Sequence, residues 1–262
     1  MANIKPYLGS ATLLSNETVM PGVYQLRLQC PEIASAARPG QFVMLKCADE
    51  LLLRRPISIS DATAPSEQIN LLIANIGKGT DWLSSREPGE ELDIIGPLGN
   101  GFDIAEKAEN VLLIAGGMGI APLNFLARKV AALGKRVTLV LGARTGDTLC
   151  PAPHLPQVDE CLLCTEDASV GIKGRVTDCP DKHIADADQV FACGPLPMYR
   201  ALAKDRRFQN KPMQVSLEVR MACGIGLCYG CTVKTRQGLK QVCEDGPVFE
   251  MGNVLWDELA DL

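Results

Sequence analysis

The chain has 262 residues, of which 47% are hydrophobic and 22% are charged, and its formal net charge is −5. This composition indicates a globular protein with a substantial core, and the negative charge argues against nucleic-acid binding, which requires clustered lysine and arginine. The sequence begins without the apolar segment of a secretory signal, and its longest apolar stretch is too short and too rich in glycine to span a membrane. We therefore expect a cytoplasmic protein.

Residues 1–102 contain short runs of β-forming residues that are separated by turn signals. Pairs such as Pro39-Gly40 and Pro88-Gly89 lie between runs at 23–30, 41–47, 55–60, 68–75 and 90–95. Short strands at regular spacing predict a small antiparallel barrel. The glycine-rich segment GPLGNGF at 96–102 is typical of a domain boundary.

Two features of the expected barrel are suited to phosphate. In RRPISIS, residues 54–60, Arg55 can pair bidentately with a phosphate group, although a solvated surface arginine is the simpler interpretation of that residue alone. In IGKGTDWLSS, residues 76–85, a glycine turn precedes a short helix with Thr80 as its N-cap. The N-terminus of a helix attracts anions, so the two features together favour a bound flavin dinucleotide.

The pattern changes after residue 102, where apolar runs alternate with helical segments. The runs at 111–115, 137–141, 160–165, 189–193 and 214–218 predict strands. Pro122 fits the first position of a helix, and Gly134 fits the residue beyond its end. Strands that alternate with helices predict a parallel sheet with right-handed crossovers.

Two loops of this expected sheet have features of a nucleotide site. AGGMGIAP at 115–122 lies between a strand and a helix, where glycine lets backbone N–H groups approach a diphosphate, although a tight turn without a ligand has the same pattern. Cys193-Gly194-Pro195 follows another strand, and both loops should lie at the carboxyl ends of neighbouring parallel strands. Cys193 could help to place a nicotinamide or could simply be buried. Arg144 could meet a 2′-phosphate or face solvent, which leaves both NAD and NADP open.

Four of the eleven cysteines form the pattern C-x4-C-x2-C-x11-C, namely Cys223, Cys228, Cys231 and Cys243. This spacing is that of plant-type [2Fe–2S] proteins, and the glycines between the thiols allow a loop to wrap closely around a cluster. A structural zinc ion, which usually takes two close cysteine pairs, and free thiols are the alternatives. The other cysteines are expected to be small hydrophobic residues, and Cys161 and Cys164 should point to opposite faces of a strand.

In chain order, the segments RRPIS, GKGT, GPLGNGF, GGMGIAP, CGP and CGIGLCYGC resemble the ferredoxin-NADP reductase superfamily, most closely its branch of type B dihydroorotate dehydrogenase electron-transfer subunits. The resemblance implies a multi-domain β and α/β fold. It consists of a flavin-binding antiparallel barrel at 1–102, a nucleotide-binding α/β domain with a parallel sheet at 103–213, and a small iron–sulfur subdomain at 214–262.

The resemblance also implies the residues that bind each group. FAD would meet Arg55, Pro56, Ile57, Ser58, Leu72, Ile73, Ala74, Gly79 and Thr80. The nicotinamide nucleotide would meet Gly116, Gly117, Met118, Gly119, Cys193, Gly194 and Pro195, and the cluster would be ligated by Cys223, Cys228, Cys231 and Cys243. The chain departs from the wider superfamily at Ile57, where a tyrosine often stacks on the flavin, and at Ile73-Ala74, where relatives often have an aromatic–arginine pair.

The implied activity is that of an oxidoreductase subunit in pyrimidine biosynthesis. Electrons would pass from the FMN of a dihydroorotate dehydrogenase catalytic subunit through the [2Fe–2S] cluster and FAD to NAD+, within a heterotetramer of two subunits of each kind. No side chain is required as an acid or base for hydride transfer. Similar subunits serve hydrogenases and bifurcating ferredoxin:NADP oxidoreductases, and in the latter the first cluster ligand is typically aspartate, where this chain has Cys223. A redox sensor or scaffold with a structural cluster is the non-enzymatic alternative.

Overall fold

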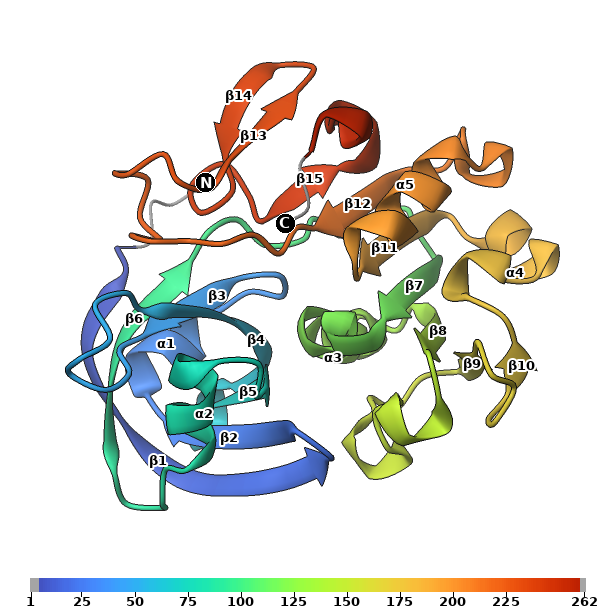
Figure 1. The fold of residues 1–262 in the computed structure, drawn as a ribbon. Coiled ribbons are helices and arrows are strands. Elements are labelled where there is room, and N and C mark those ends of the chain that lie inside the picture. The colour runs from blue at the N-terminus through green and yellow to red at the C-terminus, as the bar shows by residue number, and fades with distance from the viewer. Residues whose placement is uncertain (1–4, 260–262) are drawn as a thin grey trace.

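The computed structural model describes residues 5–259, and its N-terminal part is a closed barrel of six strands (Figure 1). Neighbouring strands are antiparallel, in the order β1-β2-β5-β4-β3-β6, which confirms the predicted barrel. The elements of this part are β1 (Tyr7–Met20), β2 (Val23–Gln29), α1 (Pro31–Ala36), β3 (Phe42–Leu45), β4 (Arg55–Thr63), β5 (Gln68–Ala74), α2 (Lys78–Ser84) and β6 (Glu91–Leu98).

The longest barrel strand, β1, is absent from the strands expected from the sequence. Only three of its fourteen residues are buried, namely Ala11, Leu13 and Val19. A strand with so few buried positions lacks the regular alternation on which sequence reasoning depends. Its place is set instead by hydrogen bonding to β2 on one side and to β6 on the other.

The second part of the chain is a seven-stranded sheet in the order β10-β9-β8-β7-β11-β12-β15. Its first six strands are parallel, as predicted, and β15 runs antiparallel to β12. The elements are β7 (Asn110–Gly116), α3 (Ile120–Ala132), β8 (Arg136–Ala143), β9 (Glu160–Thr165), β10 (Ile172–Lys173), α4 (Asp181–Asp186), β11 (Gln189–Cys193), α5 (Leu196–Lys204), β12 (Met213–Ser216) and β15 (Val248–Glu250).

Helix α3 packs between this sheet and strand β4 of the barrel. It begins at Ile120, so Pro122 occupies its third position and the expectation that Pro122 opens the helix was wrong by two residues. A short 3-10 turn at Gly117–Gly119 starts the coiling earlier, and proline is tolerated anywhere in the first turn. Gly134 follows the end of the helix with φ +74°, as predicted. Arg128 of α3 forms an ion pair with Asp61 of β4, whose side chain is buried.

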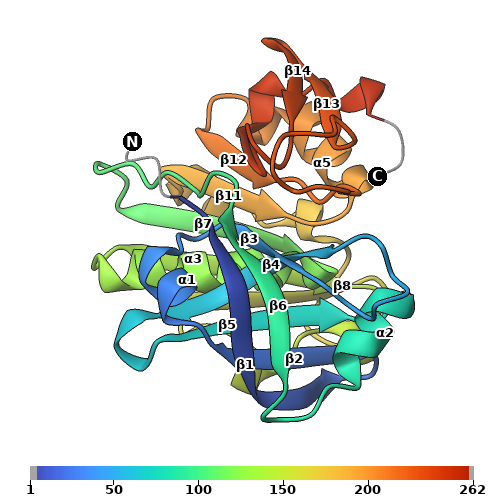
Figure 2. The ribbon, with the colours of Figure 1, turned by 90° about the vertical axis from the view of Figure 1, so that its left-hand side faces the viewer.

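The third part follows β12 and contains the hairpin β13 (Thr232–Thr235) and β14 (Gly238–Gln241), which lies above the barrel in Figures 1 and 2. Its core residues Cys231, Val242 and Cys243 belong to one buried cluster with Met44 of the barrel and Val215 of the sheet. The hydrophobic core therefore joins all three parts. Among the described residues, no helix is long and apolar enough to cross a membrane.

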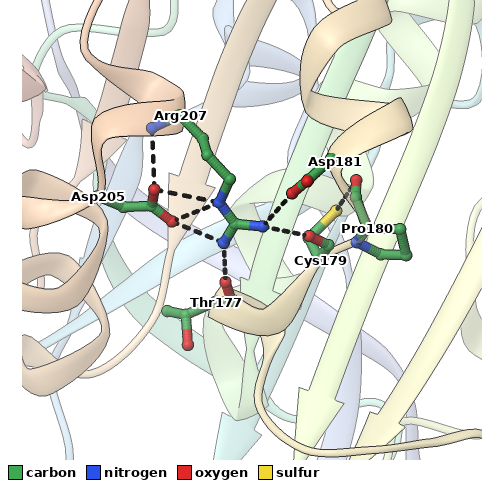
Figure 3. Close-up of polar contacts among 6 residues, drawn as sticks. All are labelled: Thr177, Cys179, Pro180, Asp181, Asp205 and Arg207. Atoms are coloured by element: carbon green, nitrogen blue, oxygen red, sulfur yellow. Dashed lines mark hydrogen bonds and ion pairs between the residues drawn. The ribbon is translucent and has the colours of Figure 1, made fainter.

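A network of hydrogen bonds around Arg207 holds the segment before α4 in place (Figure 3). Its guanidinium donates to the carbonyl oxygens of Thr177 and Cys179 at 2.8 and 2.9 Å and to the Asp181 carboxylate at 2.9 Å. It also donates to both carboxylate oxygens of Asp205, to Oδ1 at 3.1 Å and to Oδ2 at 2.9 and 2.6 Å. One side chain thus fixes the backbone of residues 177–181, which leads into α4.

We expect Arg207→Met to lower the free energy of unfolding by about 2 kcal/mol at pH 7, because the carbonyls and carboxylates lose their donor. The hydrogen bonds from Arg207 hold the pKa of Asp205 below its usual 3.8. A carboxyl group whose pKa is lowered by folding stabilises the protein above the unfolded pKa and loses that contribution as the pH falls. The difference between wild type and variant should therefore shrink below about pH 4 in urea unfolding. A difference that stays constant to acid pH would contradict this account, and the neighbouring Arg206→Met is the control.

Candidate active site

Two glycine loops meet at the carboxyl edge of the sheet, as the sequence predicts. Strands β7 and β11 are parallel neighbours, and Ala115 lies opposite Cys193 in their register. A Cβ atom at Gly119 would collide with the backbone carbonyl of Cys193. A Cβ atom at Gly116 would lie 2.9 Å from the Pro195 ring. Glycine is required here because the two loops are in backbone contact.

The Cys193 side chain points away from this edge into the core. It is completely buried, and its thiol donates to the Ser216 carbonyl at 3.5 Å. Burial raises the pKa of this thiol well above its ordinary value. Of the two interpretations of Cys193, the structure thus favours a buried cysteine at a strand end. Only its backbone remains to face a nucleotide.

The RRPIS strand and the GKGT turn of the barrel lie beside each other. The Arg55 guanidinium packs against Gly79 so closely that a Cβ atom at Gly79 would overlap it. Arg54 is used differently, since it binds both Asp93 carboxylate oxygens at 2.8 and 2.9 Å. Only the second arginine of the pair therefore lies at the turn, where the sequence places a phosphate contact.

Thr80 is not the N-cap of α2, contrary to the expectation from the sequence. The helix begins at Lys78 after Gly77, so Thr80 is its third residue. Its hydroxyl oxygen accepts hydrogen bonds from the backbone N–H groups of Ile76 and Gly77 at 3.0 and 3.1 Å. Because Gly77 takes the capping position, the helix starts at an earlier residue than expected. The Thr80 side chain then reaches back to the backbone of the turn.

The remaining candidate flavin residues lie on the neighbouring strands β4 and β5. Ile57 and Ile73 point into the barrel core, whereas Leu72 and Ala74 point outward against the core of the α/β part. Pro56 and Ser58 are half-buried. A ligand on the outer face of the barrel can meet Ile73 only through its backbone, which agrees with the absence of an aromatic–arginine pair at 73–74.

Of the four clustered cysteines, three lie on the loop before the hairpin β13–β14 and Cys243 lies just after it. The Cys231 and Cys243 sulfur atoms are 3.3 Å apart. Backbone N–H groups point at the thiols, from Gly226 to Cys243 at 3.2 Å and from Gly230 to Cys228 at 3.4 Å. Such N–H groups stabilise thiolate sulfur and tune a bound cluster. The donor set and its surroundings therefore fit an iron–sulfur cluster.

The ionisation of Cys223 supports the same conclusion. Burial would raise the pKa of this thiol, but hydrogen bonds from the backbone of Ile225 and Cys228 and from the Cys228 side chain lower it to about 7. Cys231 and Cys243 thus form one close thiol pair, and the Cys228 thiol is one of the groups that lower the pKa of Cys223. Within residues 5–259, no three His, Cys, Asp or Glu side chains are grouped so as to hold one metal ion. Four thiols at the C-x4-C-x2-C…C spacing are the donor set of a binuclear [2Fe–2S] cluster.

The seven other cysteines stand apart from this arrangement. Cys30, Cys47, Cys150 and Cys179 are buried, as predicted for small hydrophobic residues. On β9, Cys161 is exposed and Cys164 is buried, so the two thiols face opposite sides of the sheet.

The loop that carries Cys223, Cys228 and Cys231, called the cluster loop from here on, packs directly on the barrel. Gly224 has φ +72°, and a Cβ atom there would lie 2.6 Å from Cγ of Met44 on β3. Met44 in turn lies opposite Pro56 of the RRPIS motif in the β3–β4 register. Met44 therefore contacts the cluster loop through its side chain and neighbours the RRPIS motif in the sheet. No signal in the sequence marks Met44, since it is one apolar residue of a short strand.

Comparisons with known proteins agree with this geometry. Residues 218–255 match the iron–sulfur cluster binding domain of dihydroorotate dehydrogenase B. The dihydroorotate dehydrogenase B (NAD(+)) electron transfer subunit of Bacillus cereus (strain G9842) is 37% identical over 252 residues, which cover 93% of this chain and 96% of the relative. The subunit of the same name from Geobacillus thermodenitrificans (strain NG80-2) is 38% identical over 251 residues, with coverage of 93% and 97%.

Solved structures of other proteins have the same fold. A structure described as that of the NADH-dependent reduced ferredoxin-NADP oxidoreductase, in work on flavin-based electron bifurcation, superposes with a TM-score of 0.83 at 33% identity and covers 95% of this chain and 91% of its own. The ferredoxin reductase of carbazole 1,9a-dioxygenase shares the fold at a TM-score of 0.65 and 20% identity, with coverage of 77% and 65%. Identity of this extent over nearly the whole length shows that the chain belongs to the family of dihydroorotate dehydrogenase B electron transfer subunits.

Proposed function

We propose that the chain is the electron transfer subunit through which a dihydroorotate dehydrogenase catalytic subunit delivers electrons to NAD+ in pyrimidine biosynthesis. The observations that carry this function are 37% identity over 93% of the chain to a subunit of that name, and four cysteines around the hairpin β13–β14, whose preceding loop packs against the barrel. When bound, the [2Fe–2S] cluster supplies one-electron transfer, and FAD joins one-electron steps to hydride exchange with the nicotinamide.

The proposed domains are residues 1–102, 103–213 and 214–262, and β12 and β15 of the last range pair with the sheet of the second. In the barrel, Arg55 would bind a phosphate of FAD beside the Gly79-Thr80 turn, and β4 and β5 would hold the rest through Pro56, Ile57, Ser58, Leu72, Ile73 and Ala74. The two glycine loops would hold the nicotinamide nucleotide through Gly116, Gly117, Met118, Gly119, Cys193, Gly194 and Pro195. Cys223, Cys228, Cys231 and Cys243 would ligate the cluster.

The surface around the cluster loop fits a protein partner. Ile225, Leu227 and Tyr229 are exposed by 45%, 74% and 70%, and they alternate along the loop on either side of the exposed Cys228. Adjacent exposed apolar side chains mark interaction sites, and a cluster that exchanges electrons must lie close to its partner. We assign this surface to the FMN-containing catalytic subunit, in a heterotetramer with two subunits of each kind. The proposed compartment is the cytoplasm, whose reducing conditions keep thiols available for iron.

Reconstitution tests the function. The chain, purified with its FAD and cluster, is mixed with an FMN-containing dihydroorotate dehydrogenase catalytic subunit, and absorbance of NADH is followed. We expect NAD+ to be reduced by dihydroorotate only when both subunits are present, and light scattering should give the mass of the heterotetramer. Leu227→Asp should weaken this coupling and leave NADH-driven dye reduction by the chain intact. The same assay with NADP+ identifies the preferred nucleotide.

A second candidate follows from the 33% identity to the ferredoxin-NADP oxidoreductase structure. In that case, reduced ferredoxin would drive nucleotide reduction and dihydroorotate would not. This outcome in the reconstitution assay would overturn the pathway while keeping the electron-transfer role.

A further inference from the structure

Tyr199 of α5 is a fully buried tyrosine whose hydroxyl bridges two backbone groups. The side chain is 1% exposed and is among the largest fully buried side chains of the described residues. The hydroxyl accepts a hydrogen bond from the Gly194 N–H group at 2.9 Å and donates to the Ser216 carbonyl at 2.6 Å. Both geometries are those of good hydrogen bonds, so one oxygen satisfies two buried main-chain groups.

These two contacts join separate parts of the proposed machinery. Gly194 lies in the loop between β11 and α5, and Ser216 is the last residue of β12, two residues before the segment that matches the iron–sulfur domain. The Tyr199 ring also stacks on Trp256, with ring centres 5.0 Å apart and an interplanar angle of 25°. Tyr199 therefore contacts three segments: the loop at Gly194, the end of β12 at Ser216 and the C-terminal segment at Trp256.

The hydrogen bond from Gly194 fixes the orientation of the loop. Because its N–H group points inward to the tyrosine, the Gly194 peptide cannot rotate freely at the ligand edge. Its Cα atom packs against the first glycine loop, since a Cβ atom at Gly194 would lie 3.1 Å from Cα of Gly116. The tyrosine hydroxyl thus sets the distance between the two loops that face a nucleotide.

We infer that Tyr199 is a positioning residue for the nicotinamide nucleotide, acting through Gly194 on the separation of the two glycine loops. The inference rests on the proposed function, which assigns both loops to that nucleotide. A preorganised pair of loops lowers the cost of ordering the site on binding. Without the hydroxyl, the Gly194 N–H group must find another partner, and the loop can move while the strands beneath it stay hydrogen-bonded.

Tyr199→Phe isolates this effect, because phenylalanine keeps the ring and its stacking on Trp256. The full chain, loaded with FAD and cluster, is assayed for NADH oxidation with ferricyanide, and NAD+ binding is measured by calorimetry. We expect KM for NADH and Kd for NAD+ to rise about tenfold, with kcat within about twofold of wild type. FAD content and the visible circular dichroism of the cluster should be unchanged. Tyr7→Phe is the matched control, since it also removes a hydroxyl that donates to a backbone carbonyl, but at the surface.

Trp256→Leu separates positioning from packing. It removes the stacking partner and keeps the tyrosine hydroxyl, so Tm should fall while Kd for NAD+ stays at the wild-type value. A Tyr199→Phe protein with lower Tm and unchanged Kd would overturn the inference. A Trp256→Leu protein with about tenfold weaker NAD+ binding would also overturn it, even if the phenylalanine variant did not fold. If wild type neither bound NAD+ nor oxidised NADH, the proposed function would fail instead.

Discussion

Cys243→Ser should remove the [2Fe–2S] cluster and abolish dihydroorotate-dependent reduction of NAD+, while NADH oxidation with ferricyanide persists. Serine supplies a hard oxygen in place of a soft thiolate, and the Cys243 sulfur lies 3.3 Å from Cys231, where it also accepts the Gly226 N–H group. Iron content, visible absorption and electron paramagnetic resonance of the reduced protein measure the loss.

Cys161→Ser is the control for this cysteine, because Cys161 is exposed on β9 and outside the cluster loop. It should retain full iron content and full coupling to the catalytic subunit. A Cys243→Ser protein with wild-type iron content and an unaltered spectrum would exclude Cys243 as a ligand. Loss of iron in both variants would instead indicate a general sensitivity of the fold to thiol replacement.

Gly119→Ala should abolish detectable NAD+ binding and lower the free energy of unfolding by about 3 kcal/mol. The backbone of Gly119 is helical, with φ −60° and ψ −10°, so alanine meets no conformational barrier there. The cost is steric, since the added methyl group would collide with the main chain at Cys193 and Gly194, which cannot rotate away as a flexible side chain would.

Gly117→Ala provides the comparison within the same loop. Gly117 has φ +53°, and apart from its chain neighbours no atom of residues 5–259 lies within 4 Å of the position of an added Cβ. An alanine there lowers the free energy of unfolding only through the cost of its left-handed backbone conformation, which is about 1 kcal/mol. Chemical unfolding and calorimetric titration with NAD+ should therefore rank the variants, with Gly119→Ala far more damaged. Equal losses in both would mean that the close approach of the two loops is not what glycine protects.

The amino-acid sequence predicts the parts of this fold that follow from local patterns. The continuous apolar runs of β7 and β11 identify buried strands, and the cysteine spacing identifies the cluster loop. The edge where Gly119 meets Cys193 follows from the rule for parallel sheets. What the sequence leaves out is set by contacts between distant segments. Tyr199 acquires its role because β11 and β12 pair, and Met44 acquires its place because the cluster loop folds onto β3.

Local errors have local causes. Thr80 has the side chain of an N-cap, but Gly77 can adopt the extended conformation that the cap requires, and the helix starts at the earlier residue. Pro122 has the usual preference for a helix start, but the preceding 3-10 turn already supplies helical geometry. In both cases two adjacent signals compete, and only the packed structure decides between them. The individual flavin and nucleotide contacts remain predictions.

The strand β15 changes how the cluster segment should be regarded. Ser216 and Val248 lie opposite each other in the β12–β15 register, so the segment between them leaves the sheet and returns to the same edge. Its two ends are already held together by a hydrogen-bonded ladder, and the entropy of closing such a loop grows only slowly with its length. The cluster segment is therefore an excursion from one edge of the sheet with a fixed base, and changes of length in its exposed hairpin turn could be accommodated without rebuilding the nucleotide sheet.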